Sequence, residues 1–310
     1  MSSVTTKATA HAFQTDDPRL RPIHEKVLAN ARLDAGDVAA LYGSKDILAL
    51  GWLANYVRER RHGNATRFNV DSIVAAQADE SLVVGDDLDR IYRAIEAAKK
   101  SSPQARVSAL TVEELAAREN AGEVIKNLRQ AGADGLIGHS AELFLPALRK
   151  RLWHQNGTAE QRAEVRRRSL AAGLKVPLYI IQRNATSEQQ AAELLSFRED
   201  AGDSFAALSF DPDATTSLHL PMTTGMQEMK QIAIARLALD NIAHIRAYWQ
   251  MLGGKLIQIA LRFGASDLDG TSLDPNENVE ERKRELAREI TVAGREPQEI
   301  SAVRKLVVLA

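Results

Sequence analysis

The chain of 310 residues carries a formal net charge of −1, with 45% hydrophobic and 26% charged residues. This composition is typical of a soluble globular protein, the length suits one barrel-sized unit, and the balanced charge gives no electrostatic reason to expect nucleic acid or an anionic membrane as partner. The chain has no cysteine, which excludes disulfides, thiolate nucleophiles, cysteine-ligated zinc and all-cysteine iron–sulfur clusters.

The first 63 residues divide into a polar tail and a helical layer. Residues 1–20 are small and polar and lack a hydrophobic signal core, so we expect disorder there and a cytoplasmic protein. Residues 21–63 are expected to form helices. The clearest one covers 45–61, where apolar residues recur at helical spacing until Gly63 ends the pattern.

Residues 64–224 alternate between short β-type segments and helical segments. The expected strands cover 67–74, 81–85, 106–111, 135–138, 177–182 and 206–210. The expected helices cover 88–101, 112–131, 141–152, 158–172 and 187–201. Strand–helix alternation favours parallel strands with covering helices. We therefore expect an α/β fold, a partial and incomplete (β/α)6 TIM-like barrel.

The first two expected strands are too close in sequence for an ordinary crossover. Only residues 75–80 separate them, whereas a parallel crossover needs about a dozen residues or more. Two alternatives remain open. Either the two strands pair antiparallel, or a helix is missing and the barrel is open at this position.

Residues 225–310 are expected to be a C-terminal helical extension. Helices are expected at 225–240 and 248–263, joined by 246–249, and a charged, solvated helix is expected at 279–293.

Several segments together carry a resemblance to a known family. They are 48–63, 107–115, 132–144, 208–212 and 232–271, the last containing Arg236-Leu-Ala-Leu-Asp-Asn241 and Ala247-Tyr-Trp249. These segments resemble the aminofutalosine synthase branch of the radical SAM enzymes, in the futalosine route to menaquinone. The resemblance extends from about Asp46 to Thr271 and implies a barrel whose first strand precedes a CxxxCxxC loop. That loop would hold the iron–sulfur cluster that binds and cleaves SAM.

The chain departs from this family at its cofactor sites. The cysteine loop and the helix after it look deleted, which agrees with the short connection between the first two strands. Only Gly85 is left of the glycine pair expected to hold the amino group of SAM. Because SAM cleavage needs a cluster with a free site, we expect no cofactor and no radical catalysis.

Three residues are candidate catalytic groups. Glu114 and Glu142 are expected at the carboxyl ends of strands, the functional end of a β/α barrel. The alternative is that both are acids at helix N-termini, where they favour the helix dipole. His139 is three residues before Glu142, so the two share a helix face, but two ligands do not make a metal site and no metal is expected.

Arg236, His244 and Tyr248 lie in the best-matching segment and are candidates to line a substrate pocket at the barrel mouth. The alternative is that they belong to the core. The acidic segment 267–269 is expected to be a turn. The arginines between 149 and 168 are expected to form a solvated helix face, because acids interleave with them.

These observations favour a cluster-less relative of aminofutalosine synthase, linked to menaquinone biosynthesis, that is a non-catalytic partner or ligand-binding protein. The expected partners are an intact radical SAM paralogue or another enzyme of that pathway, and a small-molecule ligand. The alternative is an enzyme that performs non-radical acid–base chemistry in the remodelled pocket.

Overall fold

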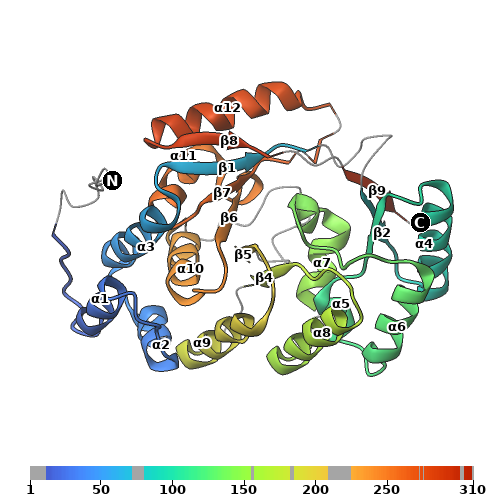
Figure 1. The fold of residues 1–310 in the computed structure, drawn as a ribbon, viewed down its shortest axis with the longest axis horizontal. Coiled ribbons are helices and arrows are strands. Elements are labelled where there is room, and N and C mark those ends of the chain that lie inside the picture. The colour runs from blue at the N-terminus through green and yellow to red at the C-terminus, as the bar shows by residue number, and fades with distance from the viewer. Residues whose placement is uncertain are drawn as a thin grey trace, which may run out of the picture.

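The computed structural model describes residues 12–71, 80–154, 157–181, 185–208, 225–271, 273–274, 276–300 and 304–308. Parallel strands curve around one interior, with helices on the outside (Figure 1). The expected α/β barrel-like architecture is confirmed.

Three helices form the N-terminal layer: α1 (Leu20–Leu28), α2 (Ala35–Gly43) and α3 (Ile47–His62). Asp34 caps α2, and Asp46 caps α3 by accepting the Ala49 backbone N–H at 3.0 Å. The expected disorder of residues 1–20 falls partly on residues outside the described ranges. Within them, Phe13 stacks on His24 with 4.2 Å between ring centroids, so the chain is already packed before α1 begins.

The larger sheet is parallel, in the order β4 (Leu178–Ile181), β5 (Ser204–Leu208), β6 (His244–Tyr248), β7 (Asp267–Asp269), β1 (Ala65–Asn69), β8 (Glu296–Glu299). A second parallel sheet has the order β3 (Arg106–Ala109), β2 (Glu80–Val84), β9 (Arg304–Val308). Parallel bridges from Ser108 to Gly135 and from Gly135 to Lys175 connect β3 with the chain that leads into β4. The two sheets therefore continue around a common interior.

The covering helices follow the strands in chain order. They are α4 (Leu88–Ser101), α5 (Val112–Ala116), α6 (Ala121–Ala131), α7 (Pro146–His154), α8 (Ala159–Ala171), α9 (Ser187–Leu195), α10 (Gly225–Ala238), α11 (Trp249–Arg262) and α12 (Val279–Val292), with 3₁₀ turns η2 (Ala141–Phe144) and η3 (Ser196–Glu199). None of the described helices is long and apolar enough to cross a lipid bilayer.

Strands β1 and β2 do not pair with each other. The neighbours of β1 are β7 and β8, and those of β2 are β3 and β9, so the expected alternative of antiparallel pairing is wrong. One C-terminal segment supplies both β8 and β9: it pairs first with β1 and then with β2 (Figure 1). This segment occupies the place where consecutive barrel strands would otherwise meet.

Three local expectations are corrected. The segment after residue 225 contains three helices but also β6 to β9, so it completes the barrel and is not only a helical extension. Residues 246–248 of the connector expected at 246–249 belong to β6, and the expected turn at 267–269 is β7. Both strands carry polar residues that face the interior, which hides their strand pattern. The strand expected at 135–138 is reduced to the bridges of Gly135.

Candidate functional site

The barrel interior has a polar side and an apolar side. Strand register places Arg67, Asp267 and Arg246 side by side on β1, β7 and β6. The layer above them contains Asn69, Asp269 and Tyr248. On the other side, β4 and β5 contribute a buried cluster that includes Tyr179, Ile181, Ala206 and Leu208. Polar side chains on three adjacent strands thus face an apolar wall.

The carboxyl ends of β1 and β7 carry a buried polar cluster of Asn69, Asp71, Ser140, Asp269 and Thr271. Ser140 Oγ donates to Asp269 Oδ2 at 2.5 Å, and the Thr271 backbone N–H donates to Asp269 Oδ1 at 2.9 Å. Asn69 Nδ2 donates to Asp71 Oδ2 at 3.0 Å and to Thr271 Oγ1 at 3.1 Å. These side chains are hydrogen-bonded to one another, which fixes the geometry of this end of the barrel.

Arg246 is the central cation of the interior. Its Nη1 donates to the His139 carbonyl and lies 3.8 Å from Asp269 Oδ2. Burial acts to lower the pKa of Arg246, but Tyr248, Asp269 and Asp267 outweigh it and raise this pKa above its ordinary value. The guanidinium is therefore charged at any physiological pH.

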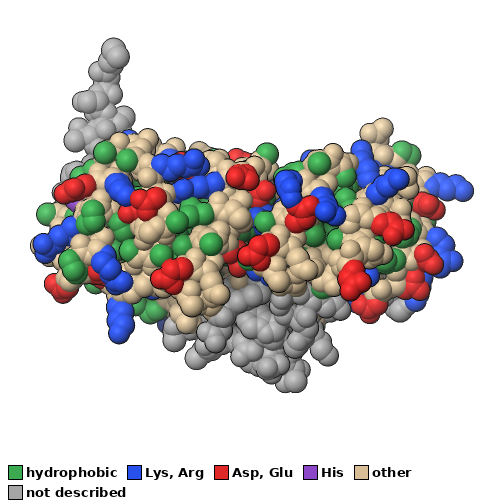
Figure 2. Space-filling view, turned by 90° about the horizontal axis from the view of Figure 1, so that it is seen from below, with side chains coloured by type: hydrophobic (Ala, Val, Ile, Leu, Met, Phe, Trp, Pro, Cys, Tyr) green, Lys and Arg blue, Asp and Glu red, His purple; other side chains and the backbone are tan. Residues whose placement is uncertain are grey.

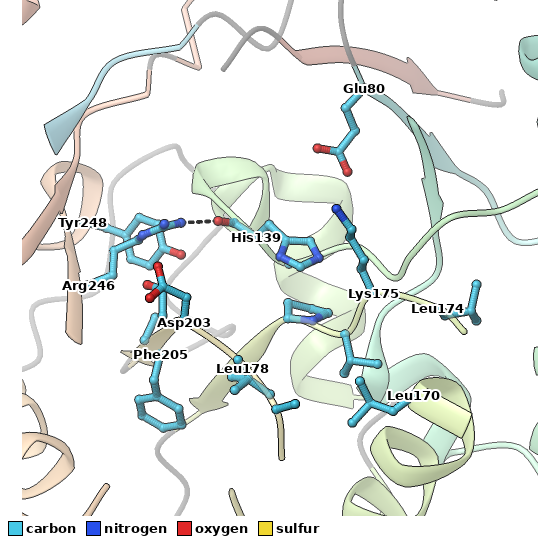
Figure 3. A pocket seen from close by; sticks show the side chains of 17 residues that line it. Glu80, His139, Leu170, Leu174, Lys175, Leu178, Asp203, Phe205, Arg246 and Tyr248 are labelled. Atoms are coloured by element: carbon cyan, nitrogen blue, oxygen red, sulfur yellow. Dashed lines mark hydrogen bonds between the residues drawn. The ribbon is translucent and has the colours of Figure 1, made fainter. Parts of the chain in front are cut away.

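A cavity of about 420 Å³ reaches this cation (Figure 3). His139, Arg246 and Tyr248 line its inner part, and residues before and at the start of β4 and β5, with Glu80 and Leu170, line the rest. Its volume falls in the range of small-molecule sites. Of the expected pocket residues, Tyr248 lines this cavity, as does the catalytic candidate His139.

Glu142 is buried, and its carboxylate accepts two backbone N–H groups. Oε1 accepts from Gly138 at 3.1 Å and from His139 at 2.7 Å. Hydrogen bonds from two peptide groups satisfy donors that would otherwise be lost inside the protein. In the described geometry Glu142 stabilises the turn that carries His139.

Glu114 is also buried, and it caps α5. Its Oε2 accepts the Thr111 backbone N–H at 2.8 Å, and its Oε1 lies 3.3 Å from Arg151 Nη1. This geometry agrees with the alternative that Glu114 is a helix N-terminal acid. Arg151 also donates to the carbonyl of Gly85 at 2.9 Å, so this glycine is engaged within the protein.

Arg236 lies behind the sheet, so its expected place at the barrel mouth is wrong. It is 0% exposed on α10 and donates to the carbonyls of Gly264 at 2.9 Å and Ala243 at 2.8 Å. Its Nη2 donates to Ser266 Oγ at 2.9 Å. All three acceptors immediately precede β6 or β7, at the amino end of the barrel.

His244 also lies at the amino end, as the first residue of β6. Its Nδ1 is 2.7 Å from Asp267 Oδ1, and Arg67 bonds the other oxygen of that carboxylate. These partners act against the desolvation of Asp267 and lower the pKa of its carboxyl. His244 therefore belongs to a closed ion network and not to the mouth at which barrel enzymes act.

His62 is expected to make the stability of the protein depend on pH. Its ring centroid lies 4.8 Å from the ring centroid of His244. Burial, and the charge of Arg236, lower the pKa of His62 from 6.5 to about 4. As the pH falls, His62 binds a proton in the unfolded chain before it does so in the folded protein. The contribution of His62 to the free energy of unfolding is therefore complete above pH 6.5 and is lost between pH 6.5 and 4. Allowing for solvent, we expect a loss of about 1 kcal/mol between pH 7.5 and 5.

Urea unfolding at both pH values measures this loss, and the His62→Asn variant is the control. Asparagine does not titrate, so the loss of stability should shrink by that amount in the variant. An equal loss in the variant would assign the pH dependence to other groups.

The arginines of α7 and α8 are not a uniformly solvated face. Arg149, Arg162 and Arg166 are 3%, 5% and 2% exposed, which corrects the expectation for these residues. Arg166 Nε bonds Asp200 at 2.6 Å and its guanidinium lies over Phe197. Elsewhere the charges are mixed, because acidic and basic side chains are interspersed on the face shown in Figure 2.

Sequence reasoning missed most of the polar cluster and Arg246. A signal was present, because polar residues alternate in Arg67, Asn69, Asp71 and again in Asp267, Asp269, Thr271. A two-residue period of polar side chains indicates a strand with one polar face. The usual expectation of an apolar interior in a small barrel hides this signal.

The donor atoms of this chain do not fit an all-cysteine iron–sulfur cluster. Such clusters are held by thiolates, and none of the 310 residues is cysteine. Among the described residues, no group of three or more His, Asp and Glu side chains is placed to hold a metal ion.

Comparison with known proteins places the chain in a family. It is 30% identical over 365 residues to the aminodeoxyfutalosine synthase of Thermus thermophilus, covering 94% of this chain and 96% of the relative. The chain belongs to the aminodeoxyfutalosine synthase family. That alignment is longer than the chain of 310 residues, so the relative carries residues without a counterpart here. No model of a known protein family matches the chain.

Other relatives agree. The aminodeoxyfutalosine synthase and the cyclic dehypoxanthine futalosine synthase of Streptomyces coelicolor are each 24% identical, covering 82% and 84% of this chain and 83% and 81% of their own lengths. Among solved structures, methylornithine synthase PylB has a TM-score of 0.55 at 16% identity, covering 89% of this chain and 97% of its own. The hydrogenase maturase HydG has a TM-score of 0.57 at 14% identity, covering 94% and 78%. These two structures support the fold alone.

Proposed function

We propose that this protein is a non-catalytic member of the aminodeoxyfutalosine synthase family, linked to menaquinone biosynthesis, which binds a pathway ligand or a pathway enzyme and does not cleave SAM. The absence of thiolates from the whole sequence carries this proposal. A cluster with an open iron is the electron donor for SAM cleavage, and the protein's share of that chemistry is to ligate it.

The C-terminal segment supports the same proposal. The family's cluster loop is expected directly after the first barrel strand, between that strand and the second. Here β1 and β2 do not pair with each other. Strand β8 pairs with β1, and strand β9 pairs with β2. A chain that has filled this position with its own backbone has adapted to the loss of the loop.

A retained interior supports binding. The cavity of about 420 Å³ still reaches Arg246 and Tyr248. In the polar cluster beside them, Asp269 accepts hydrogen bonds from Ser140 and from the Thr271 backbone N–H.

We also keep the alternative of a non-radical acid–base enzyme, but the carboxylates favour it less. Glu114 and Glu142 each accept backbone N–H groups. A catalytic acid or base must reach the substrate proton, whereas these oxygens are turned toward the peptide backbone.

Variants of Glu142 separate a structural role from a catalytic one. Glu142→Ala should lower the free energy of unfolding by about 2 kcal/mol, because two buried N–H groups lose their acceptor. Glu142→Gln should cost less than about 1 kcal/mol, because its amide oxygen still accepts. Urea unfolding measures both. If a turnover assay ever reveals an activity that Glu142→Gln abolishes while stability is kept, the acid–base alternative is correct.

A thermal-shift titration tests ligand binding. SAM, aminodeoxyfutalosine and the carboxyvinyloxybenzoate substrate of the family are titrated separately. A ligand at about 100 times its Kd stabilises the native state by roughly 2.7 kcal/mol, which is a shift of several degrees. We expect a shift with the substrate or the product and none with SAM.

Co-purification with an intact, cysteine-bearing paralogue tests partner binding. If no family ligand shifts the melting temperature and no complex forms, the proposal fails. Production of 5′-deoxyadenosine from SAM by the purified protein would overturn it directly.

A further inference from the structure

The cavity that reaches Arg246 opens at the amino end of the barrel strands. Its exposed lining residues are Lys175, before β4, and Ala201, Gly202 and Asp203, before β5. Known β/α barrel enzymes place their active sites at the opposite, carboxyl end. This mouth is therefore distinct from the one at which the family's chemistry is expected.

The inner part of the cavity carries a cation with donor capacity to spare. Arg246 uses Nη1 for the His139 carbonyl and also bonds the Tyr248 side chain, whereas its Nε has no hydrogen-bond partner among the described residues. The side chain is 16% exposed, so this donor is largely shielded from water. A buried donor without a partner costs free energy, which an incoming acceptor recovers.

The acids that line the cavity are already engaged. Glu80 accepts from Ser108 Oγ at 2.7 Å, and Asp203 pairs with Arg67 at 3.0 Å. Lys175 adds a second positive charge at the mouth, and in the described part of the chain its ammonium has no ion-pair partner. Arg246 itself lies 3.8 Å from Asp269, so Lys175 is the charge that favours an anion at the mouth.

The remaining wall is apolar. Contributions to it come from Leu170, Leu174, Val176, Pro177 and Leu178. Figure 3 shows Leu170 and Leu174 on one side, Arg246 and Tyr248 on the other, and Leu178 between them. An apolar wall that leads to one guanidinium suits a ligand with a hydrophobic body and a carboxylate, since arginine bonds that group with two donors.

We propose that this cavity binds a small organic carboxylate, which enters between the amino ends of β4 and β5 and pairs with Arg246. This proposal deepens the function proposed above and rests on it, because the same cavity is the retained interior that supports ligand binding there.

The test is a ¹⁹F NMR titration of the full-length protein with 4-fluorobenzoate, and 4-fluorobenzyl alcohol serves as the neutral probe of similar shape. We expect saturable binding of the carboxylate with a Kd of about 1 mM or tighter. The alcohol should bind at least about tenfold more weakly, because it cannot pair with the guanidinium.

Two variants place the site. Ala201→Trp puts a large side chain at the exposed mouth without touching the core, and should weaken binding at least about tenfold. Ala31→Trp, an exposed position after α1, is the matched control and should bind like wild type. Arg246→Gln should also abolish the preference for the carboxylate, and the mouth variant decides the matter if this buried substitution prevents folding.

Three results would overturn the proposal: no saturable binding by wild type, equal affinity for the acid and the alcohol, or unchanged affinity in Ala201→Trp. None of these bears on complex formation with a paralogue or on the absence of SAM cleavage. A failure here is therefore distinguishable from a failure of the proposed function.

Discussion

Replacing Arg236 with methionine is expected to lower the free energy of unfolding by about 3 kcal/mol. The side chain is fully buried and donates to two carbonyls and one hydroxyl, from Gly264, Ala243 and Ser266. Burial, with the charge of Arg61, lowers its pKa to about 9, so it is still charged at neutral pH. Methionine fills much of the space but donates no hydrogen bond. The Gly264 carbonyl loses its side-chain donor, and the Ala243 carbonyl and Ser266 Oγ keep the bonds from His62 Nε2 and the Ile245 backbone N–H.

Arg262→Met is the control, because Arg262 is exposed in the last turn of α11. It should change stability by less than about 0.5 kcal/mol. Urea unfolding at pH 7 measures both variants. A loss below about 1 kcal/mol for Arg236→Met would contradict the structural role and return Arg236 to the candidates for a binding site.

Ending the chain after Arg295 is expected to give an aggregating or unfolded protein. The truncation removes β8 and β9 and so exposes the edges of β1 and β2. Two of the lost hydrogen bonds run from Glu296 N to the Asn64 carbonyl and from Ile300 N to the Phe68 carbonyl, both at 2.8 Å. Unpaired edges of parallel strands promote association between chains. Size-exclusion chromatography and circular dichroism measure the outcome.

A pair of proline substitutions gives a graded version of this test. Ile300→Pro removes an N–H that bonds β1 and should cost about 1–3 kcal/mol. Glu299→Pro is milder, because alternate residues of a parallel strand face opposite neighbours and the native Pro297 lies on the same side as Glu299. It loses an exposed ion pair with Lys283, which is worth little. Equal stability of both variants and a monomeric truncated protein would show that this segment does not support the barrel.

Several elements could be predicted from sequence because local physics decides them. Helix α4 has the expected bounds, since its apolar residues recur at helical spacing and Asp87 caps its first turn. The family resemblance and the missing cysteine loop were also readable, because both depend on residue identity. The short connection between β1 and β2 showed that an ordinary crossover is absent there.

The C-terminal strands were beyond such reasoning. Strand β8 has the sequence Glu-Pro-Gln-Glu, which is polar and exposed and has no strand-like period. It is extended because β1 offers it a row of unpaired backbone groups, which is a property of the assembled sheet. Strands β6 and β7 were missed for a related reason, since their polar residues face a charged interior.

The sequence by itself determined which chemistry this protein lacks, because the absence of thiolates is independent of the fold. Only the tertiary structure decided what its charged residues do. Arg236 and Tyr248 are close in sequence, yet one is buried behind the sheet and the other lines a cavity. Arg236 lies on helix α10, outside the sheet, and Tyr248 lies on strand β6. The burial and the partners of both are therefore set by segments that are far apart in the chain.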